Sequence, residues 1–255
     1  MATTGATTTI DIARRVAQDI QAVRDRLEYA LLPSPQKDLF QAQQWLDALL
    51  ALRGYDERAP PLSLDEFLVL MRDKAGLETR KILSTVVRRS PAQQALGIHA
   101  GPPALAVYWL SDNSIATFMD VVETFALLRS TVKVKKSAIG LFVIIPHRKQ
   151  LSPQSNAYLR RMRSAGVNIE VFEELNLLYN PVMHSIVPSH SRMTEAQASS
   201  WLQRLRTTPD QQARLKKDDA VAQWHGFQVG DMVKIKRPEP TAGYAFESRI
   251  DPAGL

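Results

Sequence analysis

The strongest constraint on the fold is a run of apolar, β-branched residues followed by a helix signal and a second apolar run. Residues 137–146 read SAIGLFVIIP, a pattern typical of a buried strand. Ser152 and Pro153 predict the start of a helix, because proline is favoured at the first helical position, and Gly166 predicts its end. Residues 167–172, VNIEVF, predict another strand. Strand, helix and strand in this order predict a crossover unit with parallel strands.

The same periodicity arguments place further elements on both sides of this unit. Apolar residues at three- and four-residue steps predict helices, and prolines 33 and 35 separate the first two of them. Ser63 and Glu66 form the pattern of a capping box before a short helix. We expect helices over 10–31, 38–53, 63–70, 114–128, 194–205 and 220–224, and strands over 104–110, 232–236 and 243–250.

These elements predict an α+β protein overall. We expect an N-terminal extension over 1–37, an unstructured segment of nine residues followed by a helix. We then expect an α/β domain over 38–179, with a small mixed sheet and flanking helices, and a small α+β domain over 180–255, called the tail below. The strand–helix–strand pattern ends before Asn180 and Pro181, which sets the boundary between the α/β domain and the tail.

Composition excludes several classes of protein. The 255 residues include no cysteine, which excludes disulfide scaffolds, iron–sulfur clusters and cysteine nucleophiles. Phosphate-binding glycine loops and the common hydrolase and metalloprotease motifs are absent from the sequence. The six-residue spacing of His184 and His190 fits no helical zinc pair. Asp218 and Asp219 could be paired catalytic carboxylates, but they stand beside lysines, where a capping or solvated role is favoured. We therefore predict no catalytic residues, no metal and no cofactor.

Basic residues concentrate in one stretch. The net charge of +6 is unevenly placed, since residues 124–169, called the basic stretch below, hold nine basic residues and no acidic one. Such a cluster can neutralise phosphates, and the alternatives are a solvated face or a surface that docks an acidic protein. Our candidates for proximity to DNA are Lys133, Lys135, Lys136, Arg148, Lys149, Arg160, Arg161 and Arg163.

Motifs of the tail carry a specific resemblance. The string NPVMHSIVPSH over 180–190 resembles the opening of a small assembly subunit of archaeal RNA polymerase. DAVAQWHG over 219–226, GDMVKIKR over 230–237, Thr241–Gly243 and the closing Arg249–Ile250 are similar to later motifs of that family, in the same order. The eukaryotic counterpart is the fifth common subunit of nuclear RNA polymerases I, II and III, which carries the archaeal fold as its C-terminal domain.

The resemblance extends weakly upstream, and it departs from the family in places. Arg53-Gly54-Tyr55 and the strand–helix–strand unit look like the N-terminal jaw domain of the eukaryotic subunit. Gln212–Leu215 replaces the family's L-P-R-I, and Ala220 and Ser248 replace its proline and tyrosine. These differences suggest a diverged copy, which could serve polymerase I alone.

The resemblance implies a non-catalytic polymerase subunit, located in the nucleus, or in the nucleolus if it serves polymerase I. Its tail would dock on the largest subunit, and its jaw would lie beside downstream duplex DNA, with no membrane partner. A free-standing basic DNA-binding protein or a nuclease-like enzyme is the alternative. The implied docking candidates are His184, Val187, Pro188, His190, Gly226, Gly230, Asp231, Lys234, Arg237, Thr241, Gly243 and Arg249.

Overall fold

The computed structural model describes residues 4–73, 77–99, 101–112, 114–131, 139–146, 151–239 and 243–250. In these ranges the α-helices are α1 (Thr4–Leu31), α2 (Ser34–Leu52), α3 (Leu64–Asp73), α4 (Leu77–Ile82), α5 (Pro91–Ala95), α6 (Ile115–Thr131), α7 (Pro153–Ser164), α8 (Glu195–Leu205) and α9 (Ala220–His225). The strands are β1 (Thr85–Arg88), β2 (Ala104–Trp109), β3 (Ile139–Ile145), β4 (Ile169–Glu173), β5 (Ser189–Arg192), β6 (Ala213–Arg214), β7 (Met232–Glu239) and β8 (Gly243–Ile250). Short 3-10 helices cover Glu174–Leu177, Pro181–Met183 and Pro209–Gln211.

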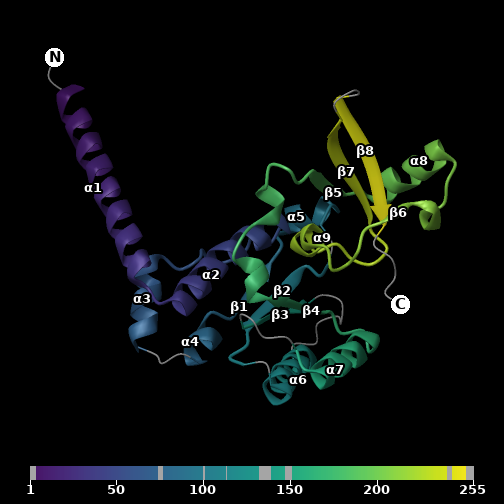
Figure 1. Ribbon diagram of the computed structural model, residues 1–255, viewed down its shortest axis with the longest axis horizontal. Coiled ribbons are helices and arrows are strands. Elements are labelled where there is room, and N and C mark those ends of the chain that lie inside the picture. The colour runs from purple at the N-terminus through teal and green to yellow at the C-terminus, as the bar shows by residue number, and fades with distance from the viewer. Residues whose placement is uncertain are drawn as a thin grey trace.

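The first sheet has the strand order β1-β2-β3-β4 (Figure 1). Strands β2, β3 and β4 are parallel, and β1 pairs with β2 in the antiparallel direction. Helix α7 connects β3 to β4, so the crossover unit expected from the sequence is confirmed. Ser152 caps α7 as expected, since its hydroxyl accepts the N–H of Ser155 at 3.1 Å.

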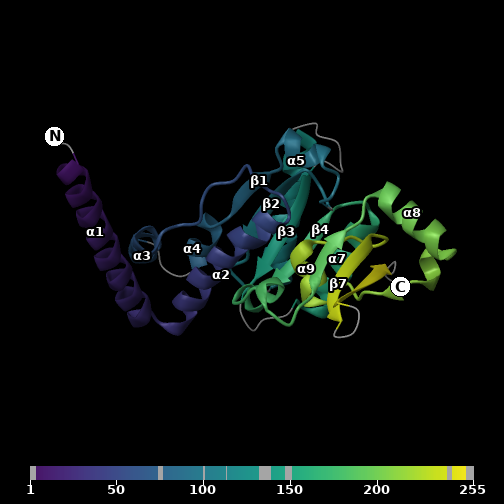
Figure 2. The ribbon, with the colours of Figure 1, turned by 90° about the horizontal axis from the view of Figure 1, so that it is seen from above.

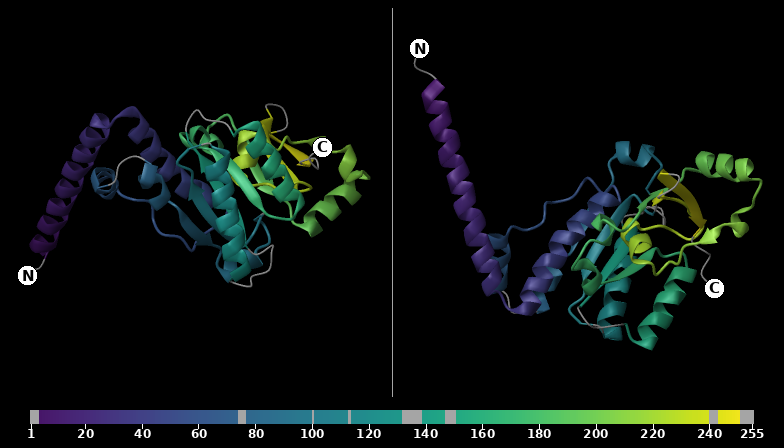
Figure 3. Two further views of the ribbon diagram at one scale, coloured as in Figure 1. Left: turned by 90° about the horizontal axis from the view of Figure 1, so that it is seen from below. Right: turned by 45° about the horizontal axis from the view of Figure 1, so that its top comes forward.

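Helices cover both faces of this sheet. Successive β3 residues point to opposite faces, which is why the strand is buried along nearly its whole length. Phe142 and Ile144 join α2 and α3 in one core, and Leu141 and Val143 join α6 and α7 in the other. Figure 3 shows α6 and α7 side by side over their face of the sheet. The predicted α+β class, with a small mixed sheet and flanking helices, is confirmed.

The tail forms a second sheet of order β5-β7-β8-β6, accompanied by α8 and α9. Val233 and Ile235 are fully buried in a small core with Leu215 and Phe227. Trp224 of α9 packs instead into the first core, and its indole N–H donates to the carbonyl of Asn176 at 3.1 Å. Figure 2 shows the tail packed on the side of the first sheet where β4 lies.

Helix α1 projects from the rest of the molecule as a long arm (Figure 1). The expectation of an unstructured segment over the first nine residues is wrong from Thr4 onward, because α1 begins there. No proline or glycine stands between Ala6 and Ile10, so the helix extends into the alanine- and threonine-rich segment. Along the arm, Val16, Ile20, Val23 and Leu27 are all at least half exposed.

Candidate partner-docking surface

The opening motif of the tail is ordered by its own polar side chains. The Asn180 side-chain oxygen accepts the N–H of Val182 at 2.9 Å and caps a single 3-10 turn. The ring Nδ1 of His184 accepts the N–H of Ile186 at 3.3 Å. The ring of His190 hydrogen-bonds the carbonyl of Pro188 at 2.7 Å. The motif residues therefore fix the path of the backbone over this segment.

This ordered turn exposes apolar side chains that motif reasoning did not select. Met183 is 75% exposed and Ile186 is 83% exposed, next to the exposed His184. Tyr179, just before the motif, is also exposed. The predicted candidates Val187 and Pro188 are half-buried. Exposed apolar side chains on an ordered turn are a common feature of binding surfaces, so Tyr179, Met183 and Ile186, called the patch below, are further docking candidates.

Strand β7 presents a basic face. Val233 and Ile235 are buried on one side of the strand, while Lys234 and Lys236 are exposed on the other side; Arg237, the next residue along, is also exposed. The alternation expected from the sequence is therefore confirmed. A charged face of this kind can set the orientation of an acidic partner.

Two predicted docking residues are used inside the fold. The carboxylate of Asp231 is buried and accepts the N–H of Arg192 Nε at 2.6 Å and the backbone N–H of Gln228 at 2.7 Å. Gly230 has a φ of +93°, which only glycine adopts without strain, so it makes the turn into β7. Asp231 and Gly230 thus shape the tail.

Arg53 joins the tail to the α/β unit. It ends α2, and its side chain is 5% exposed. Its guanidinium donates twice to the carboxylate of Glu170 on β4, at 2.9 and 2.7 Å. It also donates to the carbonyls of Gln223 and Trp224 in the last turn of α9, the latter at 3.1 Å. We call these contacts the Arg53 junction; a cation at a helix C-terminus also opposes the partial negative charge there.

Gly226 allows this junction to form. Its φ is +67°, and a Cβ at this position would lie 2.9 Å from the guanidinium carbon of Arg53. A predicted docking residue is therefore required for close packing within the chain.

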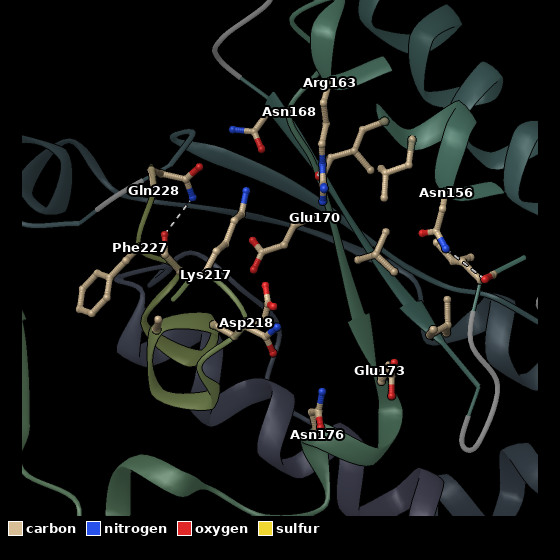
Figure 4. A pocket seen from close by; sticks show the side chains of 18 residues that line it. Asn156, Arg163, Asn168, Glu170, Glu173, Asn176, Lys217, Asp218, Phe227 and Gln228 are labelled. Atoms are coloured by element: carbon tan, nitrogen blue, oxygen red, sulfur yellow. Dashed lines mark hydrogen bonds between the residues drawn. The ribbon is translucent and has the colours of Figure 1, made fainter. Parts of the chain in front are cut away.

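A polar cavity of about 370 Å³ lies beside the junction, between β4, α7 and α9 (Figure 4). Figure 4 shows Glu170, Lys217 and Asp218 facing this space. Arg163 extends from α7 and donates from Nε to the carbonyl of Ile169 at 2.9 Å. Arg163, a predicted DNA contact, is thus held against β4 at the edge of the first sheet.

The structure describes only part of the predicted basic surface. Arg160 and Arg161 are exposed on α7, as a DNA-facing role requires. Lys133, Lys135, Lys136, Arg148, Lys149 and Thr241 lie outside the described residues. The backbone of Gly243 and Arg249 is described. Gly243 pairs with Glu239 on β7, and Arg249 pairs with Val233 on β7 and with Ala213 on β6.

His225, the last residue of α9, has a partly buried imidazole. Its ring stacks on Phe227 with centroids 4.8 Å apart and lies 6.3 Å from the ring of His190. Burial, followed by the positive charges of His190 and Arg53, lowers the pKa of His225 to about 4. The imidazole is therefore neutral near pH 7.

The described residues were searched for metal-binding groups and for membrane-spanning helices. Within the described ranges, no group of three or more His, Asp or Glu side chains is arranged to hold a metal ion. Across the same ranges, no helix combines the length and apolar character that crossing a bilayer requires.

The fold defines a class of protein: an α/β unit that carries a small α+β domain, joined to it by a buried arginine. Residues 179–250 match the family model of the RNA polymerase Rpb5 C-terminal domain. The resemblance expected from its motifs is confirmed.

Curated relatives agree with the family match. The chain is 29% identical over 124 residues to the subunit rpabc1 of DNA-directed RNA polymerases I, II and III from Dictyostelium discoideum, which covers 48% of this chain and 63% of that one. It is 37% identical over 82 residues to the corresponding RPABC1 subunits of Caenorhabditis briggsae and Caenorhabditis elegans, which covers 32% of this chain and 39% of theirs. The chain thus matches less than two thirds of the length of these relatives.

Proposed function

We propose that this chain is a non-catalytic subunit of a nuclear DNA-dependent RNA polymerase. The observation that carries the proposal is the Rpb5-type domain at 179–250, a family whose curated relatives are named as subunits of polymerases I, II and III. Its tail docks on the largest subunit through the patch of Tyr179, Met183 and Ile186 and the basic face of β7. This function implies a location in the nucleus, and in the nucleolus if the chain serves polymerase I.

The α/β unit serves as the lower jaw beside downstream DNA. Arg160 and Arg161 support this part of the proposal, because both are exposed on α7 within a stretch that has no acidic residue. Contacts of this kind bind phosphates without reading sequence, and they weaken as salt rises. A nuclease would instead need clustered carboxylates to hold Mg²⁺.

Affinity purification with the full tagged chain tests the docking step. Met183→Asp with Ile186→Asp places two charges on the patch, and we expect it to reduce recovery of the largest subunit at least tenfold. The control is Val16→Asp with Ile20→Asp, which makes the same change at exposed positions of α1. Equal recovery with both pairs would reject the patch as the docking surface.

The same purification addresses the polymerase class. A chain dedicated to polymerase I recovers only the largest subunit of that enzyme. Recovery of the largest subunits of all three polymerases would instead make it a shared subunit, and a clean preparation with no polymerase subunit would overturn the proposal.

A further inference from the structure

Helix α1 carries a row of exposed apolar side chains, called the stripe below. Its four residues recur at steps of four, three and four positions, and each is at least half exposed: Val16, Ile20, Val23 and Leu27. Figures 1 and 2 show that the N-terminal half of α1 stands clear of the other elements. The stripe is outside the family match at 179–250, so the docking proposal assigns it no role.

The stripe points away from the core of its own chain. Helix α1 packs on α2 through Tyr29, whose ring centroid lies 6.0 Å from that of Phe40 and whose hydroxyl donates to Gln41 at 3.3 Å. Asp25 and Glu28, on the same face of α1 as Tyr29, are half-buried. A helix turns by about 100° per residue, so the stripe lies about 160° to 220° from Asp25 around the helix axis. The packing of α1 on the described part of the chain therefore makes no use of the stripe.

The spacing of the stripe is that of a coiled-coil seam. Steps of three and four residues average about 3.5, which keeps the apolar side chains of two paired helices facing each other. Two antiparallel copies of α1 related by a twofold axis place Val16 opposite Leu27 and Ile20 opposite Val23. Each apolar residue of the stripe then meets an apolar residue of the second copy. The stripe is therefore complementary to itself.

Charges beside the stripe favour the same partner. Asp19 and Arg26 lie on one flank of the stripe, both are exposed, and neither forms an ion pair with another residue that the structure describes. The twofold axis that aligns the stripe brings Asp19 of each copy to Arg26 of the other. Charges at such flanking positions set the partner and the orientation of paired helices. A parallel pair would instead bring Asp19 to Arg24, which Glu28 already holds at 2.9 Å.

We propose that α1 is a self-association arm, which pairs in the antiparallel direction with α1 of a second copy of this chain through the stripe. The second copy supplies both the apolar seam and the order of charges that the arm requires. Each core lies on the outer side of its own arm, away from the contact. The tail lies at the opposite end of the molecule from the arm (Figure 1), so the proposal is independent of the docking of the tail.

Sedimentation velocity of the full chain over a concentration series tests the contact. The parent chain should move from 28.6 kDa towards twice that mass as its concentration rises. Val16→Asp with Ile20→Asp should weaken self-association by more than about tenfold, because it places charges in the apolar seam. A parent chain that remains monomeric up to about 1 mM would overturn the proposal. A double variant that associates as strongly as the parent would overturn it as well.

Charge exchange tests the identity and the direction of the partner, at low salt, where charges are least screened. Asp19→Arg and Arg26→Asp each set like charges opposite each other, so each variant alone should self-associate more than about tenfold more weakly than the parent. An equal mixture of the two should associate again, because the mixed pair has opposite charges at both contacts. The control Arg14→Asp reverses a charge on the face opposite the stripe, and it should associate as the parent does. Equal weakening by the control, or a mixture as weak as the single variants, would overturn the antiparallel pairing.

Purification of chains that carry two different tags tests other occupants of the stripe. When both are expressed together, the second tag should be recovered with the first, and Val16→Asp with Ile20→Asp should abolish this recovery. Met183→Asp with Ile186→Asp should leave it unchanged, which separates the arm from the patch. Recovery of a different protein through the stripe, with no second copy of this chain, would overturn the partner assignment.

Discussion

Replacing Arg53 with methionine should loosen the tail from the α/β unit. Methionine keeps much of the volume but removes every donor, so Glu170 and the carbonyls of Gln223 and Trp224 lose their partner. Removal of one member of a buried pair costs about 3 to 5 kcal/mol. The 27% exposure of the Glu170 side chain favours the lower end of that range. We expect Arg53→Met to lower the free energy of unfolding by about 3 kcal/mol.

Arg58→Met is the matched control. Arg58 follows α2 by a few residues and also pairs with a carboxylate, that of Asp47, but both side chains are partly exposed, at 20% and 27%. An ion pair of this kind contributes about 0.5 to 1 kcal/mol. Urea unfolding at pH 7 measures both variants.

Hydrogen exchange shows where the loss acts. Arg53→Met should raise exchange more at the amides of α9 than at those of β3, since α9 depends on the Arg53 junction for its position and β3 is held by its own neighbouring strands. Equal losses of stability for Arg53→Met and Arg58→Met, or exchange that rises equally in both elements, would refute the role of Arg53 in joining the two parts.

Three other changes follow from the same geometry. The pKa of His225 is about 4 in the folded chain and about 6.5 in the unfolded chain, so the unfolded state binds a proton first as the pH falls. The free energy of unfolding should therefore fall by about 2 kcal/mol from pH 7 to pH 5. His225→Phe should remove most of that fall, as measured by urea unfolding at the two pH values. Gly226→Ala should cost about 1 to 3 kcal/mol in the same assay, because of its positive φ and its closeness to Arg53, and a neutral result would contradict the close packing. Ser152→Ala should cost about 1 kcal/mol through loss of the α7 cap, and a thermal melt that matches the parent chain would count against the cap.

Local patterns in the sequence predicted much of the fold. The parallel unit of β3, α7 and β4 was predictable because each element has its own periodicity and its own start or stop residue. Strand β1 was not predicted, since four residues at a sheet edge carry too short a pattern, and the two-residue β6 carries none. The beginning of α1 was placed too late, because a segment of threonine and alanine carries no apolar periodicity.

The site was less predictable than the fold. The motif around His184 was recognised by resemblance, but exposure could not be derived from the sequence, so Met183 and Ile186 were missed although they lie within the motif. The Arg53 junction depends on Glu170 and α9, which are 117 and about 170 positions away in the chain. Contacts at such separations leave no local pattern, and Arg53 was noted only as part of a resemblance.

Cross-linking of the native complex tests the central claim most directly. The complex is purified through the tagged full chain and treated with a lysine-reactive cross-linker, and the linked peptides are identified by mass spectrometry. A polymerase subunit docked through its tail should cross-link from the exposed Lys234 and Lys236 on β7 to the largest polymerase subunit. Cross-links from these lysines to proteins other than polymerase subunits, in a preparation that contains no largest subunit, would contradict the account.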